Sequence, residues 1–428
     1  MDLINLNKWW ENKSFIEDDK HIKDLNNFKF IYKSKLLDYN FIKNNVYTIR
    51  GPRQIGKTTF LKLFIKDKLK NNDPKSIFYW SCDNLNNYND IIKLINDYSD
   101  YCEIHNSIPK YILIDEITSI KDWQKAIKFI IDNAIVKDIC FILTGSNIID
   151  LKKGTEKLPG RRGKDGKDLF FFPLNFKEYV KLVDNNFYEK YKKDSLNKLY
   201  YNSNKLKILF KKYLITGGIP LVINEYENNK FIPNYIYELY YSWIIGDILK
   251  EGKNEQTLKE IIKSIIQTYT TPISWDSLAK KSSIKSHLTI SDYIELLSNL
   301  LVLFPIYFKD INQNKILYYK NKKIFFYDLF IINIFLNKLN LKLDESKIVE
   351  GIVASELKRK NLFEELHYTK IKKETDFVFN KTGIEVKYQN KINKIDFLNK
   401  KYFNKFYIIS KDIYEKEIIP IYLYLFNN

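Results

Sequence analysis

Residues 45–58 read NVYTIRGPRQIGKT, an apolar run followed directly by a glycine-rich turn. The run predicts a buried strand, and a helical pattern follows from Lys57 to Lys70. The turn satisfies the pattern G-x-x-x-x-G-K-T in full and lies between a strand and a helix, as a phosphate-binding loop requires. The sequence therefore predicts a strand, loop and helix unit that holds phosphate groups.

The residue types of this loop suit a nucleoside triphosphate. Glycines let backbone N–H groups close around phosphate oxygens at the N-terminus of a helix. Lys57 is expected to neutralise the outer phosphates of ATP, and Thr58 to offer its hydroxyl to Mg²⁺. A glycine-rich turn without a ligand is the alternative. The residues expected to contact ATP are Gly51, Pro52, Arg53, Gln54, Ile55, Gly56, Lys57, Thr58 and Thr59.

A second apolar strand ends in two carboxylates, in the sequence Ile112-Leu-Ile-Asp115-Glu116. After a phosphate-binding loop, such a strand places one carboxylate near Mg²⁺ and the next near the attacking water. We expect Asp115 to hold the metal and Glu116 to activate the water. The alternative is a solvated strand end. The pair favours hydrolysis of ATP over a slow binary switch.

Polar and basic residues after the next strand, Cys140–Thr144, supply further candidates. Thr144 or Asn147 is expected to orient a water beside the γ-phosphate, although a plain exit from the strand is the alternative. Arg161, in Gly160-Arg161-Arg162-Gly163, is a candidate for stabilising transition-state charge in a neighbouring subunit, which implies a homo-oligomer. Binding of anions or of a phosphate backbone by the two arginines is equally consistent with the sequence.

The C-terminal part of the chain carries a third group of charged residues. The segments Glu374–Phe379 and Ile384–Lys387 alternate in polarity and predict a hairpin. A two-residue loop at Lys381-Thr382 would set Asp376 opposite Lys387, and Val378 opposite Glu385. Asp376, Glu385 and Lys387 then share one face, and a preceding helix offers Glu350 as a fourth member. Such a set could hold Mg²⁺ for phosphodiester cleavage. A solvated hairpin, or a nuclease fold without activity, is the alternative.

The order of apolar segments predicts an α/β fold. Strands alternate with helices in the first part of the chain, which indicates a parallel sheet covered on both faces. A helical region broken at Gly217–Pro220 follows, and then the helix, helix, turn, helix and strand order of a winged helix. The expected domains are a P-loop core (1–175), a helical subdomain (176–250), a winged helix (251–345) and a small α/β domain (346–428).

Composition limits the class of protein and its partners. A length of 428 residues predicts about three domains. The net charge of +18 favours an anionic partner such as DNA, although a solvated lysine-rich surface explains it equally well. The winged helix would approach phosphates with Lys280, Lys281 and Lys285 ahead of the helix His287–Leu301, and docking against a protein is the equal alternative.

Other classes are disfavoured by the sequence. The three cysteines and four histidines lack the spacing of a zinc site or of a disulfide framework. The start of the chain lacks the pattern of a signal peptide, so we expect a cytoplasmic protein. The longest apolar stretch, Ile324–Leu336, is interrupted by polar residues and is shorter than the roughly 20 residues that cross a bilayer, so no membrane partner is expected.

Taken together, these motifs resemble those of prokaryotic, especially archaeal, AAA+-type P-loop ATPases that carry a winged helix and a restriction-endonuclease-like C-terminal domain. The resemblance implies this architecture and ATP hydrolysis. One departure is Gly246-Asp247, where similar proteins often carry Arg-Asp. The matching segments are Trp9-Trp10, Arg50–Thr59, Ile114–Glu116, Leu143–Ser146, Gly160-Arg161, Gly217–Pro220 and Lys323–Asp328.

Two functional hypotheses follow from the sequence. The first is an ATP-hydrolysing enzyme that acts on DNA, with an added metal-dependent nuclease site. The second is a nucleotide-gated binding or signalling protein whose nuclease-like domain is inactive. They differ in turnover of ATP and in its stimulation by nucleic acid.

Overall fold

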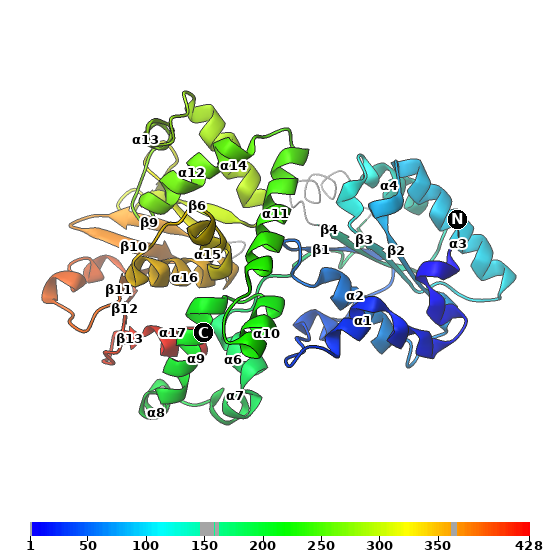
Figure 1. Cartoon of the computed structure of the whole chain (residues 1–428), viewed down its shortest axis with the longest axis horizontal. Coiled ribbons are helices and arrows are strands. Elements are labelled where there is room, and N and C mark those ends of the chain that lie inside the picture. The colour runs from blue at the N-terminus through cyan, green and yellow to red at the C-terminus, as the bar shows by residue number, and fades with distance from the viewer. Residues whose placement is uncertain (1, 146–157, 159–161, 361–365) are drawn as a thin grey trace. The chain divides into compact units, whose positions relative to one another are not determined.

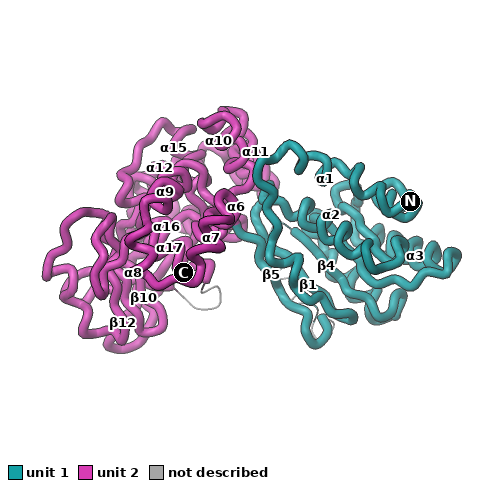
Figure 2. Tube along the Cα trace, turned by 90° about the horizontal axis from the view of Figure 1, so that it is seen from below, with its two compact units in different colours: residues 1–172 teal, residues 173–428 magenta. Residues whose placement is uncertain are grey.

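The structure, a computed structural model, describes residues 2–145, 158, 162–360 and 366–428. The chain divides into two compact units, residues 1–172 (unit 1) and 173–428 (unit 2), which are coloured separately in Figure 2. Asn147 and Arg161, both predicted site residues, lie outside the described residues.

Unit 1 is built on a parallel sheet. Its strands pair in the order β2-β3-β4-β1-β5, and each described pair is parallel. Strand β4 therefore lies between the strand that precedes the glycine-rich loop and the strand that carries the two carboxylates. The α/β class and the parallel sheet are as the sequence predicts. The strands are β1 (Asn45–Arg50), β2 (Ile77–Ser81), β3 (Tyr111–Asp115), β4 (Cys140–Gly145) and β5 (Asp168–Phe170).

Helices cover both faces of this sheet (Figure 1). Parallel strands need crossovers, and right-handed crossovers place α2 on one face and α3 and α4 on the other; α1, which precedes β1, packs beside α2. The apolar sides of these helices are buried against the strands. The helices are α1 (Lys20–Leu25), α2 (Lys57–Lys68), α3 (Tyr88–Ile104) and α4 (Trp123–Asp132).

The N-terminal segment covers the edge strand β2. The side chain of Asn7 accepts a hydrogen bond from the backbone N–H of Tyr79 at 2.8 Å and donates one to its carbonyl at 3.1 Å. The indole N–H groups of Trp9 and Trp10 both donate to the carbonyl of Ile77, at 3.2 and 2.9 Å. An exposed edge strand leaves backbone groups unpaired, so this segment satisfies the edge of the sheet.

Unit 2 begins with a series of helices, and its break at Gly217–Pro220 separates α9 from α10 as the sequence predicts. Ser274 caps α13 by accepting from the N–H of Ser277 at 3.1 Å. The helices are α6 (Phe176–Val183), α7 (Asn185–Tyr191), α8 (Leu196–Tyr201), α9 (Asn204–Thr216), α10 (Pro220–Asn229), α11 (Asn234–Lys250), α12 (Glu255–Gln267), α13 (Trp275–Lys281), α14 (His287–Asn299), α15 (Leu329–Lys338), α16 (Glu345–Lys360) and α17 (Ile421–Asn427).

The strands of unit 2 form one mixed sheet in the order β13-β12-β11-β10-β9-β6-β7, with β8 paired to β6. Strand β6, from the predicted winged-helix region, pairs in parallel with β9 from the C-terminal region. The two predicted regions therefore share a sheet. The strands are β6 (Leu303–Asp310), β7 (Lys315–Leu317), β8 (Lys323–Phe326), β9 (His367–Lys370), β10 (Glu374–Phe379), β11 (Thr382–Lys387), β12 (Lys405–Ser410) and β13 (Ile418–Pro420).

The hairpin of β10 and β11 corrects the predicted register. Phe377 pairs with Ile384 and Phe379 with Thr382, so the loop is Asn380-Lys381 and not Lys381-Thr382. Asn380 and Lys381 have φ values of 42° and 58°, which suits a two-residue turn of the primed type. The expected pairing of Asp376 with Lys387 was therefore wrong by two residues. Because side chains alternate with a period of two, the shift leaves the same residues on the same face.

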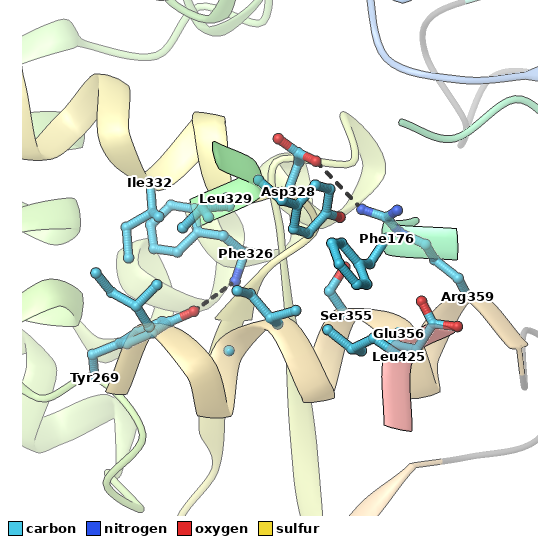
Figure 3. Close-up of a pocket in the computed structure, with 14 residues that line it drawn as sticks. Phe176, Tyr269, Phe326, Asp328, Leu329, Ile332, Ser355, Glu356, Arg359 and Leu425 are labelled. Carbon is cyan, nitrogen blue, oxygen red and sulfur yellow. Dashed lines mark hydrogen bonds and ion pairs between the residues drawn. The ribbon is translucent and has the colours of Figure 1, made fainter. Parts of the chain in front are cut away.

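The glycines of the α9–α10 break make a specific contact. The N–H of Gly218 donates to the Asp328 carboxylate at 3.0 Å, and a Cβ on Gly217 (φ +61°) would lie 2.3 Å from the same carboxylate. Asp328 lines a small interior cavity of unit 2 and forms an ion pair with Arg359 (Figure 3). Burial raises the pKa of Asp328, which Arg359 opposes. The two glycines thus allow the chain between α9 and α10 to pack against the buried Asp328 carboxylate inside unit 2.

No helix within the described part of the chain is both long and apolar enough to cross a membrane.

Candidate functional site

The glycine-rich loop of unit 1 has the backbone shape that a phosphate cradle needs. Gly56 has φ +100°, a conformation that side chains rarely adopt, and helix α2 begins at the next residue. A Cβ on Gly51 would lie 2.4 Å from the carbonyl oxygen of Phe171, so only glycine fits there. Glycine is therefore required at both positions, at Gly56 by the backbone conformation and at Gly51 by the close approach of Phe171. The two glycines shape the loop and let it pack against the chain that follows β5.

Lys57 turns back over its own loop. Its Nζ donates to the carbonyls of Gly51 and Pro52, at 2.9 Å each, and lies 3.7 Å from Oε1 of Glu116. The side chain is only 4% exposed. This buried ammonium is held by backbone carbonyls, and no carboxylate of the described residues contacts it at hydrogen-bonding distance. Such a group can bind an anion without first breaking a close ion pair.

Asp115, at the end of β3, accepts hydrogen bonds from three hydroxyl groups. Its Oδ2 accepts from Thr58 at 2.6 Å and from Tyr79 at 3.3 Å. Its Oδ1 accepts a short hydrogen bond from Thr144 on β4. Burial, together with Asp115, raises the pKa of Tyr79 well above its usual range, so the phenol remains a donor. Strands β2, β3 and β4 and the start of α2 each contribute to one carboxylate.

Glu116 follows Asp115 in a left-handed backbone conformation, with φ 48° and ψ 43°. Its N–H donates to the hydroxyl of Thr144 at 3.1 Å. The hydroxyl of Thr144 therefore contacts both carboxylate residues, and its predicted role of orienting a water stays a prediction. A positive φ is uncommon for glutamate, and this conformation turns the side chain, which is 22% exposed, toward Lys57.

The chain contains five arginines, and three of them, Arg50, Arg162 and Arg359, make ion pairs or hydrogen bonds that stabilise the fold. Arg50 forms a short ion pair with Asp168, and Arg162 contacts the other oxygen of that carboxylate at 2.9 Å. Arg359 donates to the carbonyls of Pro173 and Tyr327 at 2.8 and 2.5 Å. The planar fork of arginine suits such multiple contacts.

A second group of charges lies in unit 2, and we call it the ionic cluster. It consists of the carboxylates of Glu350, Glu374, Asp376, Glu385 and Asp396 and the ammonium groups of Lys323, Lys373 and Lys387. Helix α16 supplies the first carboxylate, β10 the next two and β11 the fourth. The structure thus brings together the predicted residues Glu350, Asp376, Glu385 and Lys387, because the hairpin face packs against α16 and β8.

Lys323, at the start of β8, lies at the centre of one half of the ionic cluster. Its Nζ is 3.1 Å from Glu350, 2.7 Å from Glu374 and 3.1 Å from Asp376. The side chain is 1% exposed. Burial alone would lower its pKa, but Asp376, Glu350 and Glu374 together raise it above its usual value. Burial and Asp376 raise the pKa of Glu350 to about 8.

Glu385 lies at the centre of the other half. Its Oε1 is 2.9 Å from Lys373 and 3.0 Å from Lys387, and burial raises its pKa. Its Oε2 is buried and accepts no hydrogen bond from the described residues. The second oxygen of Asp376 accepts from the N–H of Val386 at 2.9 Å. Most acceptors of the ionic cluster therefore already have donors.

The two groups differ in how they fit Mg²⁺. A hydroxyl and a carboxylate, Thr58 and Asp115, meet at 2.6 Å beside the loop, which is the oxygen donor set that Mg²⁺ takes next to phosphates. In the ionic cluster an ammonium occupies the point where Glu350, Glu374 and Asp376 converge. Among the described residues, no group of three or more His, Cys, Asp or Glu side chains is arranged to hold a metal ion. As they stand, the residues of the cluster do not fit the metal.

Five residues of these groups were not predicted from the sequence as site residues: Tyr79 beside the loop, and Lys323, Lys373, Glu374 and Asp396 in the ionic cluster. Tyr79 lies inside a buried strand with no motif around it. Lys323 stood in a matching segment without an assigned role, and Glu374 stood at the start of a predicted strand. Their partners are distant in sequence, so no local pattern could have identified them.

Two segments of the chain match known protein families. Residues 43–180 match a family described as an AAA domain, and residues 207–342 match a family described as a domain of unknown function (DUF8612). No curated protein matches the chain.

Solved structures show more distant similarity. The Walker-type ATPase PABY2304 of Pyrococcus abyssi is 14% identical with a TM-score of 0.42, over 68% of this chain and 90% of that one. The ORC2 protein of Aeropyrum pernix in ADPNP–ADP complexes is 13% identical (TM-score 0.39; 69% and 88% covered). The ORC1 protein of Aeropyrum pernix in complex with DNA is 12% identical (TM-score 0.34; 78% and 96% covered). These similarities are too remote to assign a role to any residue.

The family match and the loop geometry agree on the first part of the chain. Residues 43–180, which match the family described as an AAA domain, contain the glycine-rich loop, Asp115 and Glu116.

Proposed function

We propose that this protein binds and hydrolyses ATP at the glycine-rich loop of unit 1. The backbone of residues 51–58 surrounds the phosphates, and the N-terminus of α2 contributes its dipole. Lys57 leaves its two loop carbonyls and neutralises the outer phosphates. The contact of Lys57 with backbone carbonyls supports this role, because a phosphate oxygen is a stronger acceptor for an ammonium than a carbonyl.

Thr58 and Asp115 are the residues that would hold Mg²⁺. The ion supplies charge neutralisation for the β- and γ-phosphates when it is bound. Thr144 and Tyr79 orient the Asp115 carboxylate through their hydroxyl groups. Their hydrogen bonds fix the carboxylate before any ligand arrives, which reduces the reorganisation that binding requires.

Glu116 acts as the general base that orients the attacking water. Its backbone is held by Thr144, and its side chain faces the loop beside Lys57. A carboxylate within reach of the γ-phosphate position suits proton abstraction from water. We assign the hydrolytic role to Glu116 and not to Asp115, because Asp115 would hold Mg²⁺ together with Thr58.

The observation that carries this proposal is the meeting of Lys57, Thr58, Asp115 and Glu116 around one loop. Its test is a calorimetric titration of MgATP into the full chain, followed by a turnover assay. We expect binding and release of phosphate. An absence of heat on titration into folded protein would contradict the proposal.

We propose further that the ATPase acts on DNA. Support comes from the net charge of +18 and from the exposed lysines Lys280, Lys281 and Lys285 around the α13–α14 turn. Lysines in such positions contact phosphates without reading bases, so binding should depend steeply on salt and little on sequence. We expect DNA to stimulate ATP turnover, and we expect Lys280→Ala/Lys281→Ala/Lys285→Ala to remove that stimulation. Basal turnover of this variant is the control for its folding.

The assignment of residues 251–345 to a winged helix and of 346–428 to a nuclease-like domain belongs to the same proposal. The helix order α12, α13, α14 followed by the antiparallel pair β6 and β8 supports the first assignment. The convergence of Glu350, Asp376, Glu385 and Lys387 supports the second. Cleavage by that domain is a separate prediction, and a plasmid-nicking assay with Mg²⁺ or Mn²⁺ tests it.

In the ionic cluster, Lys323 occupies the point where three carboxylates converge. This arrangement favours the second candidate function for unit 2, a binding module gated by nucleotide. Turnover discriminates between the candidates. Several ATP molecules hydrolysed per minute, with stimulation by DNA, would favour the DNA-dependent ATPase. Tight retention of nucleotide without stimulation would favour the gated module.

A further inference from the structure

Lys323 has an unusual environment for a lysine. Fully buried lysines are rare unless paired, and this side chain is 1% exposed. Its strand, β8, is held by backbone pairing to β6, in which Lys323 lies opposite Ile306. The backbone therefore fixes where the ammonium can reach. It reaches the carboxylates of two other elements, α16 and β10.

The ammonium is saturated by these carboxylates. A lysine carries three N–H donors, and Lys323 meets oxygens of Glu350, Glu374 and Asp376 at 3.1, 2.7 and 3.1 Å. One donor is thus available for each carboxylate. No further ligand is needed to satisfy the nitrogen. The three carboxylates in turn converge on a single point, and that point is occupied by positive charge.

The same point is where a divalent cation would have to lie. Mg²⁺ requires oxygen ligands at roughly 2.0–2.1 Å in near-octahedral geometry, and oxygens already in contact with an ammonium cannot also close around a metal at that distance. Like charges at such a separation repel strongly where water is excluded. Lysine and metal are therefore alternative occupants of this half of the ionic cluster.

The other half does not provide a replacement site. Lys373 and Lys387 both contact Oε1 of Glu385, and Lys373 also contacts Asp396 at 3.2 Å. Oε2 of Glu385 accepts no hydrogen bond from the described residues. A single carboxylate oxygen cannot form the coordination shell of a divalent cation. The positive charge in both halves is supplied by side chains of the chain itself.

We infer that Lys323 takes the place of a divalent cation in the ionic cluster, so that the cluster ties β8 to α16 and β10 and excludes metal. The C-terminal part of unit 2 then retains the carboxylates of a metal-dependent nuclease without the metal. This inference concerns unit 2 and does not depend on ATP hydrolysis by unit 1.

The test is a titration of the full chain with Mn²⁺ alone, without nucleotide, followed by electron paramagnetic resonance and calorimetry. Wild type is compared with Lys323→Met, which keeps the length of the side chain and removes its charge. Lys322→Met is the matched control, because Lys322 precedes Lys323 in sequence and stacks over Trp275 outside the cluster. A double variant, Lys323→Met/Asp376→Asn, identifies the ligands. Any Mn²⁺ bound at Thr58 and Asp115 is common to all four proteins.

We expect Lys323→Met to gain a Mn²⁺ site that is at least tenfold tighter than any binding at the cluster of wild type. Lys322→Met should behave as wild type, and the double variant should lose the new site. The inference would be overturned if folded Lys323→Met gained no site. The single variant Asp376→Asn gives a second check. Mn²⁺ binding by wild type that is absent from Asp376→Asn would also overturn the inference.

A variant that fails to fold still leaves a decisive comparison. Wild type and Asp376→Asn are then titrated with Mn²⁺ and assayed for plasmid nicking. Equal Mn²⁺ binding by the two proteins, with no nicking by wild type, supports the inference. Nicking by wild type that is lost in Glu385→Gln overturns it.

Discussion

The loop of unit 1 and the ionic cluster of unit 2 each bury a lysine beside carboxylates, but they leave its charge in different states. Lys57 donates to two backbone carbonyls and lies 3.7 Å from Glu116. Lys323 meets three carboxylates within 3.1 Å. The first ammonium can accept an anion at little electrostatic cost, whereas the second is already neutralised.

The comparison shows that identical residue types do not make equivalent sites. A lysine among carboxylates binds a ligand only where its nearest partners are weak enough to be exchanged. In unit 1 the charge of Lys57 would be balanced by a bound phosphate, whereas in unit 2 the charge of Lys323 is balanced by carboxylates of the chain itself. Each of the variants below alters one side of this contrast.

Glu116→Gln should have the largest effect in unit 1. The amide cannot accept a proton from water, so we expect turnover of ATP to fall by about a thousandfold, within the range typical of a general base. MgATP binding, measured by calorimetry, should persist. Glu103→Gln, an exposed glutamate at the end of α3, is the matched control. Unchanged turnover in Glu116→Gln would remove the assigned role.

Lys323→Met should destabilise the protein in the absence of metal. Removing one partner of a buried ionic group typically costs about 3 kcal/mol or more, because the remaining charges stay buried. The free energy of unfolding in urea measures this effect. Lys322→Met, whose lysine makes no described ion pair, should cost much less. Equal costs for the two variants would show that the cluster does not need the ammonium.

Lys57→Ala should weaken MgATP binding by about a hundredfold, since one charge-assisted contact with the phosphates contributes on the order of 3 kcal/mol. Calorimetry measures the change. Lys66→Ala, on the same helix and 40% exposed, is the control and should bind as wild type does. Retained affinity in Lys57→Ala would mean that the ammonium does not contact the nucleotide.

Glu350→Gln should change how stability depends on pH. The pKa of Glu350 is raised to about 8 in the fold, so the stability it contributes is complete below its ordinary value of 4.5 and is lost as pH rises through 8. We expect the variant to gain in Tm relative to wild type between pH 5 and pH 8. Glu345→Gln, at the exposed start of the same helix, should show no such trend.

Tyr79→Phe should have the smallest effect. It removes one of the hydroxyl groups on Asp115 and leaves the ring packed, so we expect roughly a fivefold loss of turnover, equivalent to about 1 kcal/mol. Steady-state assays at several Mg²⁺ concentrations measure it, with the loss in kcat and not in the KM for ATP. Tyr88→Phe, on α3, is the control. A loss confined to Tm would indicate a structural role.

Much of unit 1 could be predicted from sequence because its signals are local. The strand Asn45–Arg50 was expected with the bounds that the structure shows, and the helix after the loop ends within two residues of its predicted end. The hairpin in unit 2 was expected on the correct face but in the wrong register. Register depended on the backbone conformation of Asn380 and Lys381, which an alternating pattern does not specify.

The sequence by itself determined the phosphate-binding loop, since Lys57 and the carbonyls it contacts are at most six residues apart. It also determined the alternation of strands and helices that forms the parallel sheet. Only the tertiary structure decided the partners of the carboxylates. Tyr79 lies 36 residues from Asp115, and Lys323 lies 53 residues from Asp376. Contacts between residues so far apart in sequence depend on how whole strands and helices pack. This packing surrounds Lys323 with three carboxylates, whereas Lys57 contacts mainly backbone carbonyls that a phosphate can replace.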